Sequence, residues 1–153
     1  MNLSYFRKDI QNLRGLAIFF VLIFHFYPEY LPKGYLGVDL FFVISGYLIT
    51  SIFFNKKNIS FLGFIKKRII RLVPPILGAI ILCIFFSYFL FLPIDLSNFW
   101  NSVLSTLFFI PNFYFLLNGG YFSGINELKP LLHMWSLGVE IQFYIFYPFI
   151  LFL

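Results

Sequence analysis

Ionisable side chains inside long apolar stretches are the first residues of this sequence that could do chemistry. His25, Asp39 and Glu140 each lie in or beside such a stretch. A charged group at the centre of a membrane helix costs about 2.5–3.5 kcal/mol on insertion scales, and such groups normally face a protein interior or a wet cavity. Each of the three is therefore a candidate site residue.

Arg14 and His25 are eleven residues apart, which is close to three turns of an α-helix. On one helix the two side chains share a face and lie roughly 16 Å apart along the axis. A cation at one end of a helix face and an imidazole at the other suit a ligand whose anionic head binds the cation and whose reactive tail reaches the imidazole. Alternatively, the Arg14 side chain extends to the membrane surface and His25 lies at the outer interface without a catalytic role.

His133 and Glu140 are seven residues apart, which predicts a second pair on one helix face. A carboxylate near an imidazole can orient the ring and raise its basicity, as in general-base dyads. The alternative is a histidine at a helix end and a glutamate paired with some basic residue. Two histidines and scattered carboxylates without an HExxH spacing indicate no metal site.

Gly34 and Gly37 precede Asp39 at the start of the second apolar stretch. Small residues let helices approach closely, so packing explains the glycines. Asp39 suits the dipole at a helix N-terminus, or it is a partner of His25 across the turn. Ser45 lacks a G-x-S-x-G context, so a serine nucleophile is not supported.

The elements that must position these residues are membrane helices. Of the 153 residues, 61% are hydrophobic, 24% are aromatic and 11% are charged. Soluble domains have about 45–50% apolar and about 25% charged residues, and disordered chains are poor in aromatics. The single cysteine, Cys83, excludes an internal disulfide and a cysteine-based zinc site. We therefore predict an all-α, polytopic transmembrane helical bundle.

Five apolar segments are predicted, at about 10–27, 35–54, 72–92, 99–117 and 131–153. The fourth is more polar and interrupted by Pro111, so it either spans the membrane or forms a re-entrant or interfacial segment. The basic loop at 55–73 is expected to form an amphipathic helix on the cytoplasmic leaflet, ended by Pro74 and Pro75. Since the chain stops inside an apolar run, we expect residues 1–153 to be the N-terminal part of a larger membrane domain.

Nine of the eleven basic residues lie in two short segments beside apolar runs, at the N-terminus and in the loop at 55–73. This bias is the positive-inside pattern. It predicts a cytoplasmic N-terminus, a cytoplasmic loop at 55–73 and an external turn at 28–33. The charges therefore indicate topology rather than nucleic-acid binding. Alternatively, the basic loop only holds anionic membrane lipid, at about 1 kcal/mol per cation.

Four blocks, in this order, resemble the acyltransferase 3 family of integral-membrane O-acyltransferases. They are residues 6–14 (FRKDIQNLR) followed by His25, residues 34–50 (GYLGVDLFFVISGYLIT), residues 64–74 (FIKKRIIRLVP) and residues 130–148 (PLLHMWSLGVEIQFYIFYP). Residues 112–114 (NFY) and 120–122 (GYF) are also similar to the family. The resemblance spans essentially the whole chain, and the combination of blocks is highly specific.

The resemblance implies a membrane enzyme of the bacterial inner membrane that takes acetyl-CoA or another acyl-CoA as its donor substrate and binds no permanent cofactor. Its acceptor is a hydroxyl of a cell-surface glycan or a lipid-linked sugar. By the same resemblance, His25 is the catalytic histidine and Arg14 is its partner, while Asp39 and Glu140 match acidic positions. Arg68 and Arg71 match a basic motif, and with Lys67 they are expected to bind the donor.

We therefore expect part of a membrane O-acyltransferase that transfers acetyl groups to a surface polysaccharide. Proton abstraction from a sugar hydroxyl by a positioned histidine contributes typically about 10²–10⁴-fold to the rate. A transient acyl-imidazole is the competing role for His25. The alternative reading is a non-catalytic membrane protein or an inactive fragment with a lipid-binding basic loop.

Overall fold

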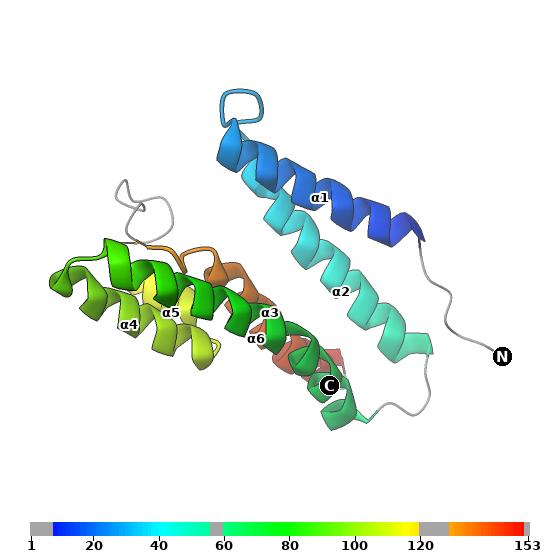
Figure 1. The fold of residues 1–153 in the computed structure, drawn as a ribbon. Coiled ribbons are helices and arrows are strands. Elements are labelled where there is room, and N and C mark those ends of the chain that lie inside the picture. Colours follow the sequence, from blue (N-terminus) through cyan, green and yellow to red (C-terminus); the bar gives the residue numbers. More distant parts are fainter. Residues whose placement is uncertain (1–7, 56–59, 120–128, 152–153) are drawn as a thin grey trace. The chain divides into compact units, whose positions relative to one another are not determined.

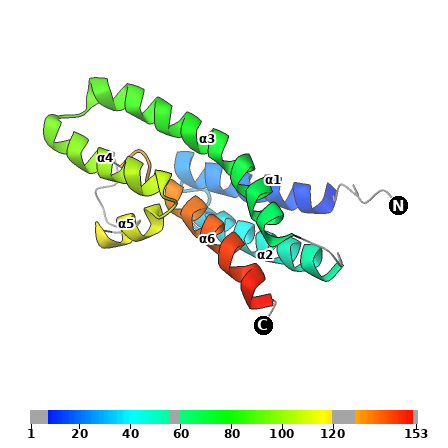
Figure 2. The same ribbon diagram turned by 90° about the horizontal axis from the view of Figure 1, so that it is seen from below.

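A computed structural model describes residues 8–55, 60–119 and 129–151 of the chain. These residues form helices joined by turns, with no strand within the described ranges, which confirms the all-α prediction (Figures 1 and 2). In chain order the elements are α1 (Lys8–Phe26), the short 3-10 helix η1 (Gly34–Leu36), α2 (Gly37–Asn55), α3 (Phe61–Leu90), α4 (Pro93–Leu107), α5 (Pro111–Leu117) and α6 (Met134–Leu151). The chain divides into two compact units, Met1–Lys57 and Asn58–Leu153.

In the described part of the chain, four helical segments are long and apolar enough to cross a membrane: Lys8–Phe26, Gly34–Phe54, Phe61–Leu90 and Met134–Leu151. The segment predicted at about 99–117 is not one helix. It is divided between α4 and α5, which have 15 and 7 residues. Both are short of the ~20 residues that a bilayer core requires. The break between them includes Phe109, whose φ of 59° lies in the left-handed region.

The predicted end of the basic helix at Pro74 and Pro75 is wrong, because α3 runs without interruption from Phe61 to Leu90 and contains both prolines. Proline has no N–H, so the carbonyls of Ile70 and Arg71, four residues earlier, lose their helical donors. The helix nevertheless continues, because apolar residues surround the prolines. If the helix ended in lipid, all the backbone groups of its last turn would lose their hydrogen bonds, and no water is present there to replace them. This costs more than the two hydrogen bonds that the prolines remove.

The first unit is built on close contact between α1 and α2, which run side by side (Figure 1). A Cβ atom added to Gly34 would lie 2.4 Å from the carbonyl oxygen of Phe20, and one added to Gly37 would lie 2.4 Å from that of Ala17. No side chain fits at such distances. The packing interpretation of the two glycines is confirmed.

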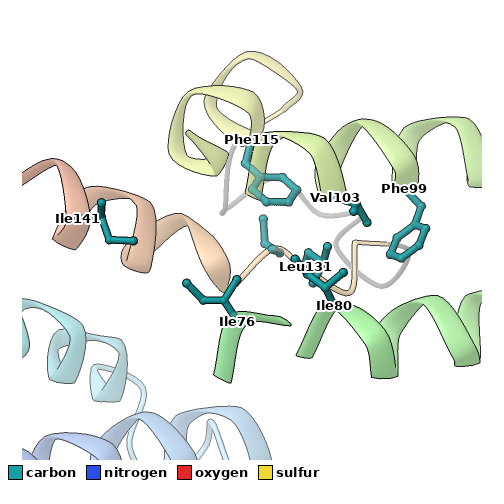
Figure 3. Close-up of a cluster of buried hydrophobic side chains, with 8 residues drawn as sticks. Ile76, Ile80, Phe99, Val103, Phe115, Leu131 and Ile141 are labelled. Carbon is teal, nitrogen blue, oxygen red and sulfur yellow. The ribbon is translucent and has the colours of Figure 1, made fainter. Parts of the chain in front are cut away.

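The core of the second unit gathers apolar side chains from α3, α4, α5, α6 and the turn before α6 (Figure 3). Its buried members are Ile76, Ile80, Phe99, Val103, Phe115, Leu131, Leu132 and Ile141. Leu131 is fully buried in that turn. The core therefore joins α6 to three helices that precede it in the chain.

A polar clamp joins α5 to α6 beside this core. The side-chain amides of Asn112 and Gln142 bond to each other in both directions, at 3.1 and 2.9 Å. The Gln142 amide also donates to the carbonyl of Phe109 at 3.0 Å. Gly138 makes room for the contact, since a Cβ atom there would lie 2.8 Å from the Pro111 ring. The clamp thus fixes the strained turn between α4 and α5 onto α6.

Candidate functional site

Arg14 and His25 both lie on the uninterrupted helix α1, so the shared face predicted from their spacing is confirmed. Arg14 is half-buried, and its guanidinium carbon lies 5.7 Å from the centre of the Phe41 ring on α2. This distance is within the range of a cation–π contact. Arg14 is thus held against α2 rather than extended away from the helix pair.

His25 occupies the last turn of α1 and is exposed. Its Nδ1 atom lies 2.7 Å from the carbonyl oxygen of Val21. A carbonyl can only accept a hydrogen bond, so Nδ1 carries the hydrogen of this bond. In the neutral ring the basic nitrogen is then Nε2. The backbone of α1 thereby sets both the orientation of the imidazole and its tautomer.

Asp39 lies in the first turn of α2 and is exposed. With Lys33 it lines a groove of about 390 Å³ whose other walls are apolar, including Phe20, Leu31 and Leu40. The groove belongs to the first unit. A direct contact between Asp39 and His25 stays a prediction.

The basic motif lies on the first turns of α3 and belongs to the second unit. Lys67 and Arg71 are exposed, whereas Arg68 is half-buried. The guanidinium carbon of Arg68 lies 5.4 Å from the centre of the Phe64 ring and 5.4 Å from that of Tyr144 on α6. Arg68 and Arg71 are three residues apart on a continuous helix, so they are neighbours on its surface.

Glu140 lies on α6, is half-buried, and accepts a hydrogen bond from the hydroxyl of Tyr144. Sequence reasoning missed Tyr144, although its position four residues after Glu140 places the two on one helix face. His133 lies in the turn before α6 rather than on it. The helix face predicted for His133 and Glu140 is therefore wrong, because α6 begins only at Met134.

The candidate residues thus fall into two groups. Arg14, His25 and Asp39 belong to the first unit, and Lys67, Arg68, Arg71 and Glu140 belong to the second. Within the described ranges, no three His, Cys, Asp or Glu side chains form a group that could hold a metal ion. The N-terminal motif residues 6 and 7, the lysines at 56 and 57 and the motif at 120–122 lie outside the described residues.

A family model described as an acyltransferase domain matches residues 7–153 of the chain. The chain belongs to the acyltransferase 3 family. The match confirms the resemblance seen in the four sequence blocks. Together with the four apolar helices, membership of this family of membrane acyltransferases identifies an integral membrane protein.

Two relatives show what this acyltransferase 3 chain is similar to. It is 35% identical over 147 residues to "O-acetyltransferase OatA" of Staphylococcus aureus (strain NCTC 8325 / PS 47), covering 93% of this chain and 24% of the relative. It is 34% identical over 145 residues to "Peptidoglycan O-acetyltransferase OatA" of Listeria monocytogenes serovar 1/2a (strain ATCC BAA-679 / EGD-e), covering 92% of this chain and 23% of the relative. The chain thus spans about a quarter of these relatives' length. No solved structure matches it.

Proposed function

We propose that this chain acts in a membrane O-acyltransferase that moves an acetyl group from acyl-CoA to a hydroxyl of a cell-surface glycan. The observation that carries the proposal is His25 on the Arg14 face of α1, with its Nδ1 held by the carbonyl of Val21. The names of the relatives, O-acetyltransferase and peptidoglycan O-acetyltransferase, support the acetyl group and the glycan acceptor.

In the proposed reaction, Nε2 of His25 takes the proton of the acceptor hydroxyl while the hydroxyl oxygen attacks the thioester carbonyl. The new ester C–O bond forms, the C–S bond breaks, and the imidazolium returns its proton to the leaving thiolate. In the competing route Nε2 itself attacks the thioester, forming an N–C bond as the C–S bond breaks and the thiolate leaves. The acceptor hydroxyl then attacks the acyl carbon, the N–C bond breaks and the hydroxyl proton passes to the thiolate. The fixed Nδ1–H suits both routes, because each requires a basic Nε2.

The donor is proposed to bind at the basic motif of α3. Arg68 and Arg71 are adjacent on the helix surface, and Lys67 is exposed beside them. Guanidinium groups match phosphate oxygens with paired hydrogen bonds, which suits the phosphates of coenzyme A. The positive-inside bias supports an orientation with the N-terminus and the basic motif on the cytoplasmic side, and the bacterial relatives support a bacterial cytoplasmic membrane.

The test measures acetyl groups on surface glycan in cells that lack their own O-acetyltransferase. The cells produce residues 1–153 together with the part of the S. aureus relative that lies beyond the matched region. We expect His25→Ala to lower acetyl transfer by at least about 100-fold, the low end of lost acid–base catalysis. His25→Asn keeps a side-chain N–H donor but has no basic nitrogen, so we expect an equal loss.

Tyr30→Ala is the matched control, since Tyr30 is an exposed ring in the turn that follows α1. Its transfer should stay within twofold of the wild-type value. Full transfer by His25→Ala would contradict the proposed function.

A further inference from the structure

Tyr144 on α6 contacts two candidate site residues at once. The centre of its ring lies 5.4 Å from the guanidinium carbon of Arg68, and its hydroxyl donates a hydrogen bond to Glu140. Only 5% of Tyr144 is exposed. A buried ring on α6 therefore contacts a cation on α3 and a carboxylate on its own helix.

Arg68 lies against two rings rather than one. Phe64, one turn before Arg68 on α3, is also 5.4 Å from its guanidinium carbon. The Phe64 and Tyr144 rings are 6.4 Å apart and meet at 81°, edge to face. Two touching rings thus pack against the Arg68 guanidinium, whereas the side chain of Arg71 is exposed.

The contacts of Tyr144 reinforce each other. A phenol that donates a hydrogen bond to a carboxylate gains electron density in its ring, because hydrogen-bonded groups polarise one another. A ring with a more negative face attracts a cation more strongly. Glu140 therefore acts on Arg68 through the Tyr144 ring.

We propose that Tyr144 is a positioning residue that holds the Arg68 guanidinium at the contact between α3 and α6. An anion that reaches Arg71 then meets a second guanidinium that is already oriented. That this anion is a phosphate of the acyl donor rests on the proposed function. The positioning itself does not depend on it.

The experiment measures how fast phenylglyoxal modifies each arginine of the full chain in lipid nanodiscs, by mass spectrometry of its peptides. In the wild type, Arg68 should react more slowly than Arg71, because Arg68 is half-buried and two rings pack against its guanidinium. Tyr144→Leu removes one ring and should raise the rate at Arg68 by about fivefold, as loss of a partly desolvated cation–π contact implies. The rate at Arg71 should stay within twofold.

Two further variants separate positioning from packing. Tyr144→Phe keeps the ring but loses the bond to Glu140, so the rate at Arg68 should lie between those of the wild type and Tyr144→Leu. Tyr147→Leu is the matched control, because Tyr147 stacks on Phe143 at 4.5 Å on the same helix. It should leave both arginines at their wild-type rates.

The proposal is overturned if Tyr144→Leu leaves the rate at Arg68 unchanged. It is also overturned if the rates at Arg68 and Arg71 rise equally, which identifies a general loss of packing, or if Tyr144→Phe reacts as fast as Tyr144→Leu. A second arm adds coenzyme A to the wild type. Slower modification of both arginines in the presence of coenzyme A supports the donor site. An unchanged rate counts against the donor site but leaves the positioning role of Tyr144 unaffected.

Discussion

At the scale of single residues, the two arginines of the basic motif have different surroundings. Arg71 is exposed, whereas the half-buried Arg68 packs against the rings of Phe64 and Tyr144. A guanidinium loses less freedom on binding an anion when it is already held in place. We therefore expect Arg68 to determine the geometry of an anion site and Arg71 to contribute mainly charge and a second pair of donors.

Replacing either arginine by lysine keeps the charge but removes the planar pair of donors. We expect Arg68→Lys and Arg71→Lys each to weaken coenzyme A binding by about tenfold, since the paired hydrogen bonds to phosphate are lost. Isothermal titration calorimetry on the full chain in nanodiscs measures the affinity.

Lys66→Ala is the control for bulk charge, because Lys66 is exposed on the same helix. It removes a positive charge that the proposed site does not use, so its effect should be smaller than that of either arginine variant. An unchanged affinity in both arginine variants would show that only total charge matters and that the donor site is assigned wrongly.

At the scale of elements, the pair α1–α2 depends on two glycines. A side chain at Gly37 would collide with the backbone of α1, as the 2.4 Å distance to the Ala17 oxygen shows. Overpacking of this kind costs about 1–3 kcal/mol. Gly37→Ala should therefore lower the unfolding temperature of the protein in detergent, measured by circular dichroism.

Gly15 supplies the matched control, since it lies on α1 and a Cβ atom there would meet nothing within 4 Å. Gly15→Ala should leave stability unchanged or raise it by about 0.5–1 kcal/mol, because alanine favours a helix over glycine. Equal stability of Gly37→Ala and Gly15→Ala would contradict the close approach of the two helices.

The clamp between α5 and α6 permits a prediction about the break after α4. Gln142→Leu removes three hydrogen bonds and leaves the Asn112 amide without its partner on α6. We expect a loss of about 1 kcal/mol, the low end of the cost of leaving a polar group unsatisfied, because Asn112 is half-buried. In a double-mutant cycle, Asn112→Leu with Gln142→Leu should cost less than the sum of the single changes. Additive losses would show that the two amides do not act together.

Local spacing was sufficient for some elements and not for others. The shared face of Arg14 and His25 and the close packing at Gly34 and Gly37 follow from helical geometry and residue size. The path of α3 through Pro74 and Pro75 does not follow from local rules. Proline usually ends a helix, but in lipid the cost of unpaired backbone groups is greater, so the helix continues. The contact of Arg68 with Tyr144 joins residues far apart in sequence, so only the packing of α3 on α6 reveals it.

At the scale of the whole molecule, the distribution of basic residues predicts the topology. In a Cys83→Ala background, which removes the single cysteine, Lys33→Cys should react with a membrane-impermeant maleimide added to intact cells. Lys66→Cys should react only after the membrane is opened. External labelling of Lys66→Cys would invert the proposed orientation.

Residues 1–153 produced by themselves cover about a quarter of the length of the relatives. The proposed reaction requires a site closed to water and lipid, and the relatives have much longer chains. We therefore expect no acetyl transfer to surface glycan from residues 1–153 alone, and restored transfer when the part of the S. aureus relative beyond the matched region is supplied. Transfer by residues 1–153 alone would show that they contain a sufficient site.

The prolines within α3 bear on how the protein responds to bilayer thickness. A helix of 30 residues is ~45 Å long, which exceeds a hydrocarbon core of ~30 Å. A rigid rod of this length would have to tilt as a unit to match the lipid. The two missing hydrogen bonds lower the cost of bending α3 near Pro74, so we expect the apolar second part to adjust its tilt while the basic first part keeps its contact with α6. We therefore expect the arginines to keep their depth at the membrane surface in thin and thick bilayers alike.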